Sequence, residues 1–162
     1  DVIALDLAED RLERARALGA QTINPATENA DARIKELHGT TTVFGREKSQ
    51  TDAYIDAAGA PSILAQVVGL AKTHARHVIT AAYIKPVELP AGPMLTTEMT
   101  ITTAVGYPTE FPDVIAAMPR LKDKIATLIS HRLPFEQVIE ALEIAATPQS
   151  AKVMIRFDEI EE

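Results

Sequence analysis

The chain opens on an apolar stretch that runs directly into an acidic residue and then into a helix. Residues 2–5 (Val-Ile-Ala-Leu) have the uninterrupted apolar character of a strand that is buried on both faces of a parallel sheet, and Asp6 follows at once. Residues 10–20 are spaced as in a helix, and Gly19 is placed to end it. A buried strand that leads into a helix is typical of folds in which helices cover a parallel sheet.

Composition restricts the possible partners. The net charge is −7 and the pI is about 5.1, and no cluster of basic residues provides the positive face that nucleic acid requires. Aromatic residues make up only 4% of the chain, so surfaces that stack bases or sugars are poorly supplied. A small ligand held by backbone groups fits this composition better, and we expect no nucleic-acid partner.

Cysteine content and hydropathy exclude further classes. The sequence has no Cys, so it can form neither a disulfide nor a thiolate zinc site. No apolar stretch approaches the roughly 20 residues of a spanning helix, and no signal peptide is recognisable at the start. We therefore expect a cytoplasmic protein without a membrane partner.

Strands and helices alternate along the chain. Prolines 86, 90 and 93 predict a surface loop, Pro119 predicts a helix break, and residues 39–51 predict an exposed loop or irregular hairpin. The expected fold class is α/β, a Rossmann-like, mostly parallel sheet with helices on both faces. The expected strands are 2–5, 21–25, 53–56, 76–80, 99–105 and 152–157, and the expected helices include 10–20, 26–38, 62–72 and 134–146.

Ligands of parallel sheets bind at the carboxyl ends of the strands. In dinucleotide-binding folds, an acid at the end of the second strand binds the adenine ribose, roughly 20 residues after a glycine-rich loop. Asp6 occupies such a strand end, but nothing precedes its strand, so we expect the domain to be incomplete at its N-terminal side. The other strand ends, at residues 57–59, 80–82 and 104–106, are small and uncharged, and a flat ring and a ribose could lie against their backbone.

The ordered set of these segments resembles the coenzyme-binding half of medium-chain, zinc-dependent alcohol and polyol dehydrogenases. It includes the strand with Asp6, the helix 11–20 with its Ala-Leu-Gly-Ala end, Thr22-Ile23-Asn24, Ile55-Asp56-Ala57-Ala58-Gly59, and the segment from Leu128 to Phe135. The resemblance runs from residue 2 to residue 157. It implies that residues 1–162 are part of an NAD(P)-binding Rossmann domain.

The resemblance also implies a set of coenzyme contacts. Asp6 looks like the acid that binds both ribose hydroxyls, which favours NAD over NADP because a carboxylate repels a 2′-phosphate. Arg11 resembles the basic residue over that ribose, and Lys152 resembles a basic position near the pyrophosphate. The strand-end residues expected beside the coenzyme are Ala58, Thr80, Ala82, Ala104 and Gly106.

The family's glycine-rich loop and zinc-bearing catalytic domain have no counterpart in the sequence. Since zinc lowers the pKa of the alcohol before hydride transfer, we expect this chain alone to be inactive. In an intact parent, the resemblance implies hydride transfer from a small alcohol or polyol to NAD, and a homodimer or homotetramer assembled through the strand around Ile101. Without the family's central first strand, the strands 2–5 and 53–56 are expected either to flank a gap or to pair directly.

Other interpretations compete with these assignments. Asp6 could simply cap the following helix, and Arg11 and Lys152 could be solvated surface residues. His74 and His77 are interpreted as a surface pair rather than metal ligands, because no third ligand lies nearby. The sequence does not have the spacing of functional residues that a phosphoacceptor domain or a short-chain reductase requires. A non-catalytic nucleotide-sensing Rossmann-type module remains the alternative function.

Overall fold

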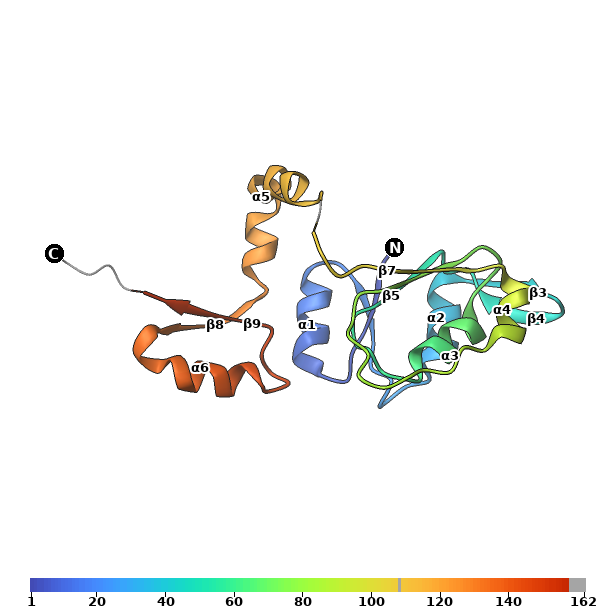
Figure 1. Cartoon of the computed structure of the whole chain (residues 1–162), viewed down its shortest axis with the longest axis horizontal. Coiled ribbons are helices and arrows are strands. Elements are labelled where there is room, and N and C mark those ends of the chain that lie inside the picture. Colours follow the sequence, from blue (N-terminus) through green and yellow to red (C-terminus); the bar gives the residue numbers. More distant parts are fainter. Residues whose placement is uncertain (108, 158–162) are drawn as a thin grey trace. The chain divides into compact units, whose positions relative to one another are not determined.

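A computed structural model describes residues 1–107 and 109–157 (Figure 1). The chain divides into two compact units, one made of residues 1–28 and 108–162 and the other of residues 29–107. The division runs through the sequence so that the second unit is a continuous insertion in the first.

The first part of unit 1 is a βαβ unit. Its elements are β1 (Ile3–Leu5), α1 (Glu9–Ala17) and β2 (Gln21–Ile23), and β1 pairs with β2 in parallel. Leu12 on α1 and Ile23 on β2 are almost completely buried, and they form the core of this part. Gly19 ends the helix with a φ of +97°, a conformation that glycine adopts without a steric penalty. The opening strand and helix are therefore confirmed, but the predicted burial of the strand on both faces is wrong, since Val2 is 67% exposed and Leu5 is 43% exposed.

The second part of unit 1 holds one strand that the sequence analysis missed. Helix α6 lies along the parallel pair of β8 and β9, with Leu133 and Ala141 buried between them (Figure 1). Strand β8 falls in the segment from Leu128 to Phe135, which carried the family resemblance but was given no secondary structure. The elements are α5 (Phe111–Ala126), β8 (Ile129–Pro134), the short 3-10 helix η1 (Phe135–Gln137), α6 (Val138–Ala145) and β9 (Lys152–Arg156).

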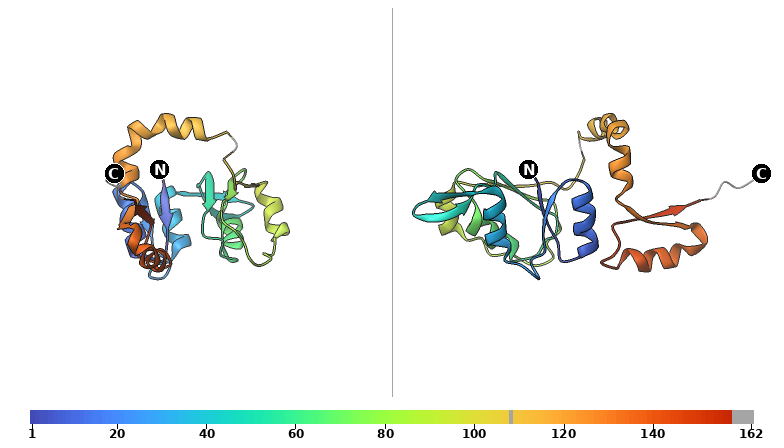
Figure 2. Two further views of the ribbon diagram at one scale, coloured as in Figure 1. Left: turned by 60° about the vertical axis from the view of Figure 1, so that its left-hand side comes forward. Right: turned by 180° about the vertical axis from the view of Figure 1, so that it is seen from behind.

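The sequence predicted a helix break at Pro119, but Pro119 does not end helix α5. The helix continues through it and bends sharply, as Figure 2 shows in its left view. A proline inside a helix removes one backbone hydrogen bond and pushes its ring against the preceding turn, so a kink is the usual outcome. The helix tolerates Pro119 at the expense of straightness.

Unit 2 contains a parallel sheet in the order β5-β6-β7, so β6 is the central strand and β7 an edge. An antiparallel hairpin of β3 and β4 precedes it, turning at Phe44 and Gly45, both of which have positive φ. The elements are α2 (Ala30–His38), β3 (Thr40–Val43), β4 (Arg46–Ser49), β5 (Ala53–Asp56), α3 (Ile63–Leu70), β6 (Arg76–Ile79), α4 (Ala91–Thr97) and β7 (Thr100–Thr103).

The hairpin is confirmed, but it is not wholly exposed. Lys48 is 6% exposed and Ser49 is fully buried. The Lys48 ammonium donates hydrogen bonds to the backbone oxygens of Val68 and Gly69, at the end of α3. A cation at a helix C-terminus satisfies carbonyls that have no partner within the helix. The hairpin therefore holds α3 through a buried side chain.

Two further predictions in unit 2 are wrong. The proline-rich segment is not entirely a loop, since α4 covers residues 91–97 and Pro93 lies in its first turn, where no backbone N–H is needed. His77 is not a surface residue: it is 1% exposed on the central strand, in register with Tyr54 and Ile101. Burial lowers the pKa of His77. His74 is exposed, so the two histidines do not form a pair.

The α/β class and the mostly parallel pairing are confirmed. The alternative in which the strands 2–5 and 53–56 pair directly is wrong, because β1 pairs with β2 and β5 pairs with β6 in separate sheets. Within the described residues, no helix combines the length and the apolar character needed to cross a membrane.

Candidate functional site

Asp6 lies at the carboxyl end of β1 and is held by the start of the next helix. Its Oδ1 accepts a hydrogen bond from the backbone N–H of Ala8, 2.9 Å away, and its Oδ2 lies 3.5 Å from the guanidinium of Arg11. The side chain of Asp6 is 33% exposed and that of Arg11 is 47% exposed. The carboxylate is therefore fixed in direction while part of it remains open to a ligand.

The interpretation of Asp6 as the N-cap of the following helix is wrong. The N-cap of α1 is Ala8, and Asp6 accepts its hydrogen bond from the cap residue itself rather than from the first turn of the helix. Its role is thus to shape the strand-to-helix connection. This role occupies Oδ1 and leaves Oδ2 facing Arg11.

The carboxyl ends of β5, β6 and β7 form one edge of the sheet in unit 2. Since the strands are parallel and adjacent, the segments that follow them emerge on the same side. The backbone N–H of Ala104 donates to the oxygen of Ile79, which continues the pairing of β7 with β6 to the end of the strand. This edge carries the predicted coenzyme-binding residues Ala58, Thr80, Ala82, Ala104 and Gly106, and all five are exposed.

Asp56, at the end of β5, organises this edge. It is 2% exposed, and its Oδ1 accepts hydrogen bonds from the backbone N–H groups of Ala58 and Gly59, each at 2.9 Å. Its Oδ2 accepts a short hydrogen bond from the hydroxyl of Tyr83. One buried carboxylate thus joins the loop after β5 to the loop after β6.

The backbone oxygen of Asp56 adds three more hydrogen bonds. It accepts the N–H groups of Thr80 and Ala81, at 2.9 and 3.1 Å, and the Thr80 hydroxyl at 2.9 Å. The hydroxyl of Thr80 is therefore already used within the protein. Thr80 is available to a ligand mainly through its exposed surface and not through a free donor.

The electrostatics of Asp56 and Tyr83 follow from these contacts. Burial raises the pKa of Asp56, but hydrogen bonds from Tyr83, Gly59 and Ala58 outweigh burial and lower the pKa below its usual value. Burial, the hydrogen bond to Asp56 and the charge of Asp56 raise the pKa of Tyr83 to about 12. At neutral pH, Asp56 is therefore an ionised carboxylate that accepts a hydrogen bond from the protonated hydroxyl of Tyr83.

Sequence reasoning did not assign a role to either member of this pair. Asp56 entered only as part of the segment Ile55-Asp56-Ala57-Ala58-Gly59 that carries the family resemblance, and Tyr83 was not singled out. The available signal was an acid directly after a buried strand, followed by two small residues and Gly59. Lys152 lies at the start of β9, not at a carboxyl strand end, and its predicted role near the pyrophosphate stays a prediction.

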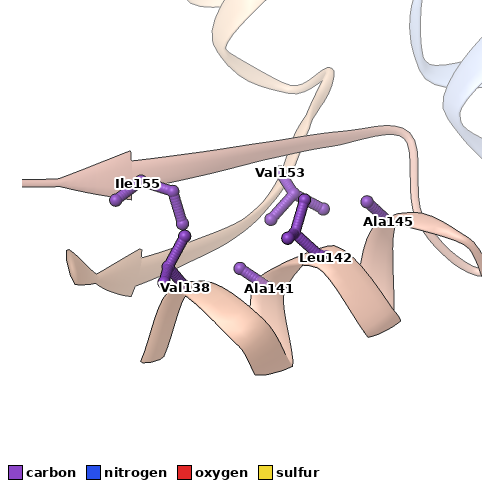
Figure 3. A pocket seen from close by; sticks show the side chains of 6 residues that line it. All are labelled: Val138, Ala141, Leu142, Ala145, Val153 and Ile155. Carbon is purple, nitrogen blue, oxygen red and sulfur yellow. The ribbon is translucent and has the colours of Figure 1, made fainter. Parts of the chain in front are cut away.

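Unit 1 also contains a hollow whose lining is apolar. It lies between α6 and β9, and Figure 3 shows only aliphatic side chains pointing into it. Aliphatic groups offer no donor for a phosphate or a ribose, so we do not assign a nucleotide to it. Its lining residues are Val138, Ala141, Leu142, Ala145, Val153 and Ile155.

Metal-ligating residues do not gather anywhere in residues 1–107 and 109–157. No group of three or more His, Asp or Glu side chains in this part of the chain could hold a metal ion, and the sequence has no Cys. A zinc site needs at least three protein ligands. The described residues therefore do not fit a zinc ion.

Comparisons with known proteins connect these features. Residues 1–120 match a family model described as zinc-binding dehydrogenase. Sorbitol dehydrogenase from Rattus norvegicus is 28% identical over 97% of this chain and 43% of its own length. The starvation-sensing protein RspB from Escherichia coli (strain K12) is 29% identical over 98% of this chain and 45% of its own. The chain thus spans less than half the length of these relatives.

A solved structure agrees with the sequence matches. A short chain alcohol dehydrogenase (rspB) from E. coli CFT073, complexed with cofactor NADH, is 29% identical and covers 97% of this chain, with a TM-score of 0.81. This chain corresponds to 44% of that structure. The agreement extends over both units of the chain and supports the Rossmann-like fold.

Proposed function

The chain belongs to the zinc-binding dehydrogenase family, and on that premise we propose that it is the coenzyme-binding part of an NAD-dependent alcohol or polyol dehydrogenase. The observation that carries this proposal is the pairing of Asp6 with Arg11 at the carboxyl end of β1. In this position a carboxylate accepts hydrogen bonds from the two hydroxyls of an adenosine ribose. The rspB structure with NADH, from a relative of 29% identity, supports the choice of a nicotinamide coenzyme.

NAD is preferred to NADP in this proposal. Asp6 is charged and half-buried, and a 2′-phosphate on the ribose would be brought against it. Leu7, the next residue, is 69% exposed and offers no positive charge to such a phosphate. Arg11 is the nearby cation, but its guanidinium faces the Asp6 carboxylate, which leaves it less free to neutralise a phosphate.

The nicotinamide side of the coenzyme is assigned to the edge formed by β5, β6 and β7. Ala58, Thr80 and Ala82 present small side chains there, so a flat ring can approach the backbone closely. Ala104 and Gly106 continue this surface after β7. Lys152 is assigned to the pyrophosphate, because its exposed ammonium is attracted to phosphate charge.

The described residues contribute coenzyme binding rather than metal chemistry. They supply no zinc site, so no step of the reaction is derived from a metal held by them. Their part in hydride transfer is to hold the coenzyme in a fixed direction and to shield one side of its ring. We accordingly expect this chain by itself to bind coenzyme poorly, because it lacks the glycine-rich loop, and not to oxidise an alcohol.

The substrate and the assembly are inferred from relatives and from the sheet. Sorbitol dehydrogenase and (R,R)-butanediol dehydrogenase are among the similar proteins, which supports a small alcohol or polyol as the hydride donor. They also favour the dehydrogenase over the nucleotide-sensing alternative. Strand β7 is an edge of its sheet, and we assign it, around Ile101, to pairing with a second copy in a homodimer or homotetramer. A cytoplasmic location completes the proposal.

The decisive experiment is coenzyme binding by an Asp6→Ala variant of the full-length protein that carries this chain. Loss of a charged acceptor for ribose hydroxyls should weaken NADH binding about tenfold, and it should reduce the preference for NADH over NADPH. The measurement is the fluorescence of bound NADH and NADPH during titration. Asp10→Ala is the matched control, because Asp10 is an exposed acid in the first turn of α1. Equal affinities for NADH in the wild type and in Asp6→Ala would refute the proposal.

A further inference from the structure

The loops after β5 and β6 meet at a single buried carboxylate. Asp56 accepts hydrogen bonds from Ala58 and Gly59 in the first loop and from Tyr83 in the second. The two loops also touch directly, since a Cβ placed on Gly59 would lie 2.9 Å from the oxygen of Ala82. The distance between the loops is therefore fixed by contacts within the protein.

The loop after β6 has few other anchors. None of residues 80–90, all of which the structure describes, is buried. Ile84, the neighbour of Tyr83, is 97% exposed, so apolar packing does not hold the loop at this point. The hydrogen bonds of residues 80 and 81 to the Asp56 oxygen fix only the beginning of the loop. The hydroxyl of Tyr83 extends this attachment to residue 83.

The hydroxyl of Tyr83 also donates to Oδ2 of Asp56, the carboxylate oxygen that the two backbone donors do not reach. Asp56 is 2% exposed, and a buried carboxylate is costly unless each oxygen accepts hydrogen bonds. Oδ1 has two backbone donors, whereas Oδ2 has the hydroxyl of Tyr83. Removal of this one oxygen atom from the tyrosine would leave Oδ2 to find water, and the loop would have to open to admit it.

We propose that Tyr83 is a positioning residue for the coenzyme, because its hydrogen bond to Asp56 holds the loop after β6 against the loop after β5 and so presets the surface formed by Ala58, Thr80 and Ala82. This inference rests on the proposed function, which assigns the nicotinamide side of NAD to that surface. Tyr83 acts through Asp56 and the loop, and its hydroxyl is not offered to the coenzyme. A preset surface binds its ligand more tightly because less loop ordering is lost on binding.

The test is a Tyr83→Phe variant of the full-length protein, which keeps the ring and removes only the hydroxyl. We expect its dissociation constant for NADH to rise about tenfold, the size of effect that one hydrogen bond to a charged group produces. The turnover number at saturating coenzyme should be unchanged, because the reacting groups are untouched. Hydrogen exchange at the amides of Ala58, Gly59, Thr80 and Ala81 should become faster, since all four donate to Asp56.

Tyr54→Phe is the matched control. Tyr54 lies in β5 of the same unit, and its hydroxyl faces Ser49 and Thr51 rather than the strand-end loops. Its variant suffers the same chemical change, and we expect NADH affinity and exchange at the four amides to stay at wild-type values. The double variant Asp56→Asn with Tyr83→Phe should have a dissociation constant for NADH no higher than the higher of the two single-variant values. The reason is that the two residues act as one unit.

Several outcomes would overturn the inference. Unchanged NADH affinity in Tyr83→Phe would do so, and so would an equal loss in Tyr83→Phe and Tyr54→Phe, which would indicate general destabilisation. If the wild type binds no NADH, the proposed function fails and the assignment of Tyr83 to the coenzyme fails with it. Amide exchange still reports on the loop in that case, so the failure of the function is distinguished from the failure of the Tyr83 attachment.

Discussion

The backbone of Gly59 lies so close to Ala82 that a Cβ on Gly59 would come within 2.9 Å of the Ala82 oxygen. Gly59 also has a φ of +68°, a conformation that side chains rarely adopt. Two independent constraints therefore require glycine at this position. The close approach arises because the loops after β5 and β6 are in contact at the proposed coenzyme site.

Substitution of Gly59 by alanine should destabilise the protein more than the same change at another positive-φ glycine. Gly45 has a φ of +73° in the β3–β4 turn, but open space surrounds the position of its Cβ. Gly45→Ala should cost about 1–2 kcal/mol of unfolding free energy from backbone strain alone. Gly59→Ala adds a steric clash and should cost more. Urea denaturation measures both, and equal losses would show that the loops separate freely.

The lowered pKa of Asp56 makes part of the stability depend on pH. A carboxyl whose pKa is lower in the folded than in the unfolded state stabilises the fold above the unfolded value of 3.8. This contribution is lost as the pH falls through the folded pKa. The stability gap between the wild type and Asp56→Asn should therefore narrow as the pH falls below 3.8.

A second variant tests whether the hydrogen bond from Tyr83 helps to lower the pKa of Asp56. Tyr83→Phe removes one of the three hydrogen bonds that the carboxylate accepts, and those from the backbone N–H groups of Ala58 and Gly59 remain. Its stability should therefore fall less steeply with acid than that of the wild type. Denaturation series across the acidic range supply the measurement, and identical curves for the two proteins would contradict the hydrogen-bond assignment.

Lys48 should contribute strongly to the stability of unit 2. A Lys48→Met change keeps the length of the buried stem but removes the donors to Val68 and Gly69, which should cost about 1–3 kcal/mol. Lys85→Met is the control, because Lys85 is exposed in the loop after β6. Chemical denaturation of the two variants compares them, and a loss no larger in Lys48→Met than in Lys85→Met would refute the role of Lys48.

Lys48 also predicts an effect at alkaline pH. Burial, followed by the charges of Arg46 and Lys35, lowers the pKa of Lys48 below 10.5. The unfolded chain then holds more protons than the folded one between the folded pKa and 10.5, so Lys48 adds stability as the pH rises through that window. The stability gap between the wild type and Lys48→Met should widen there. A constant gap would mean that burial leaves the titration of Lys48 unaffected.

Replacement of Pro119 by alanine should straighten α5 and raise its helicity. A proline in a helix interior costs about 3 kcal/mol relative to alanine, whereas a proline in the first turn is tolerated. Pro112 occupies that tolerated place in the same helix, so Pro112→Ala is the matched control. Circular dichroism should show an increase for Pro119→Ala and little change for Pro112→Ala. No difference between the two would indicate that the kink has another cause.

Elements with a clear local pattern were predictable from the sequence. The apolar run before Asp6 predicted β1, and the short segments that contain Tyr54-Ile55 and Val78-Ile79 predicted β5 and β6, because β-branched and aromatic residues favour strands. Two predictions based on prolines are wrong. Pro93 predicted a surface loop and Pro119 a helix break, but Pro93 lies in the first turn of α4 and Pro119 is accommodated by a bend in α5.

Features that depend on distant contacts were not predictable. His77 could be assigned to a strand, but its burial follows from a register that places Tyr54 and Ile101 on either side. The hydrogen bond between Asp56 and Tyr83 joins residues 27 positions apart, and no local sequence pattern predicts it. The sequence therefore pointed to these strand ends as a candidate site, which stays a prediction, while the hydrogen bonds between the loops that follow them became apparent only from the fold.

The burial of Lys48 has a practical consequence for studying this protein in solution. Acylating reagents attack a free amine, and the amine of Lys48 is enclosed and occupied by two backbone oxygens. It becomes reactive only when the hairpin separates from α3. The acylation rate of Lys48, measured by mass spectrometry, would thus report how often unit 2 opens. The exposed Lys85 is the unprotected standard in the same sample.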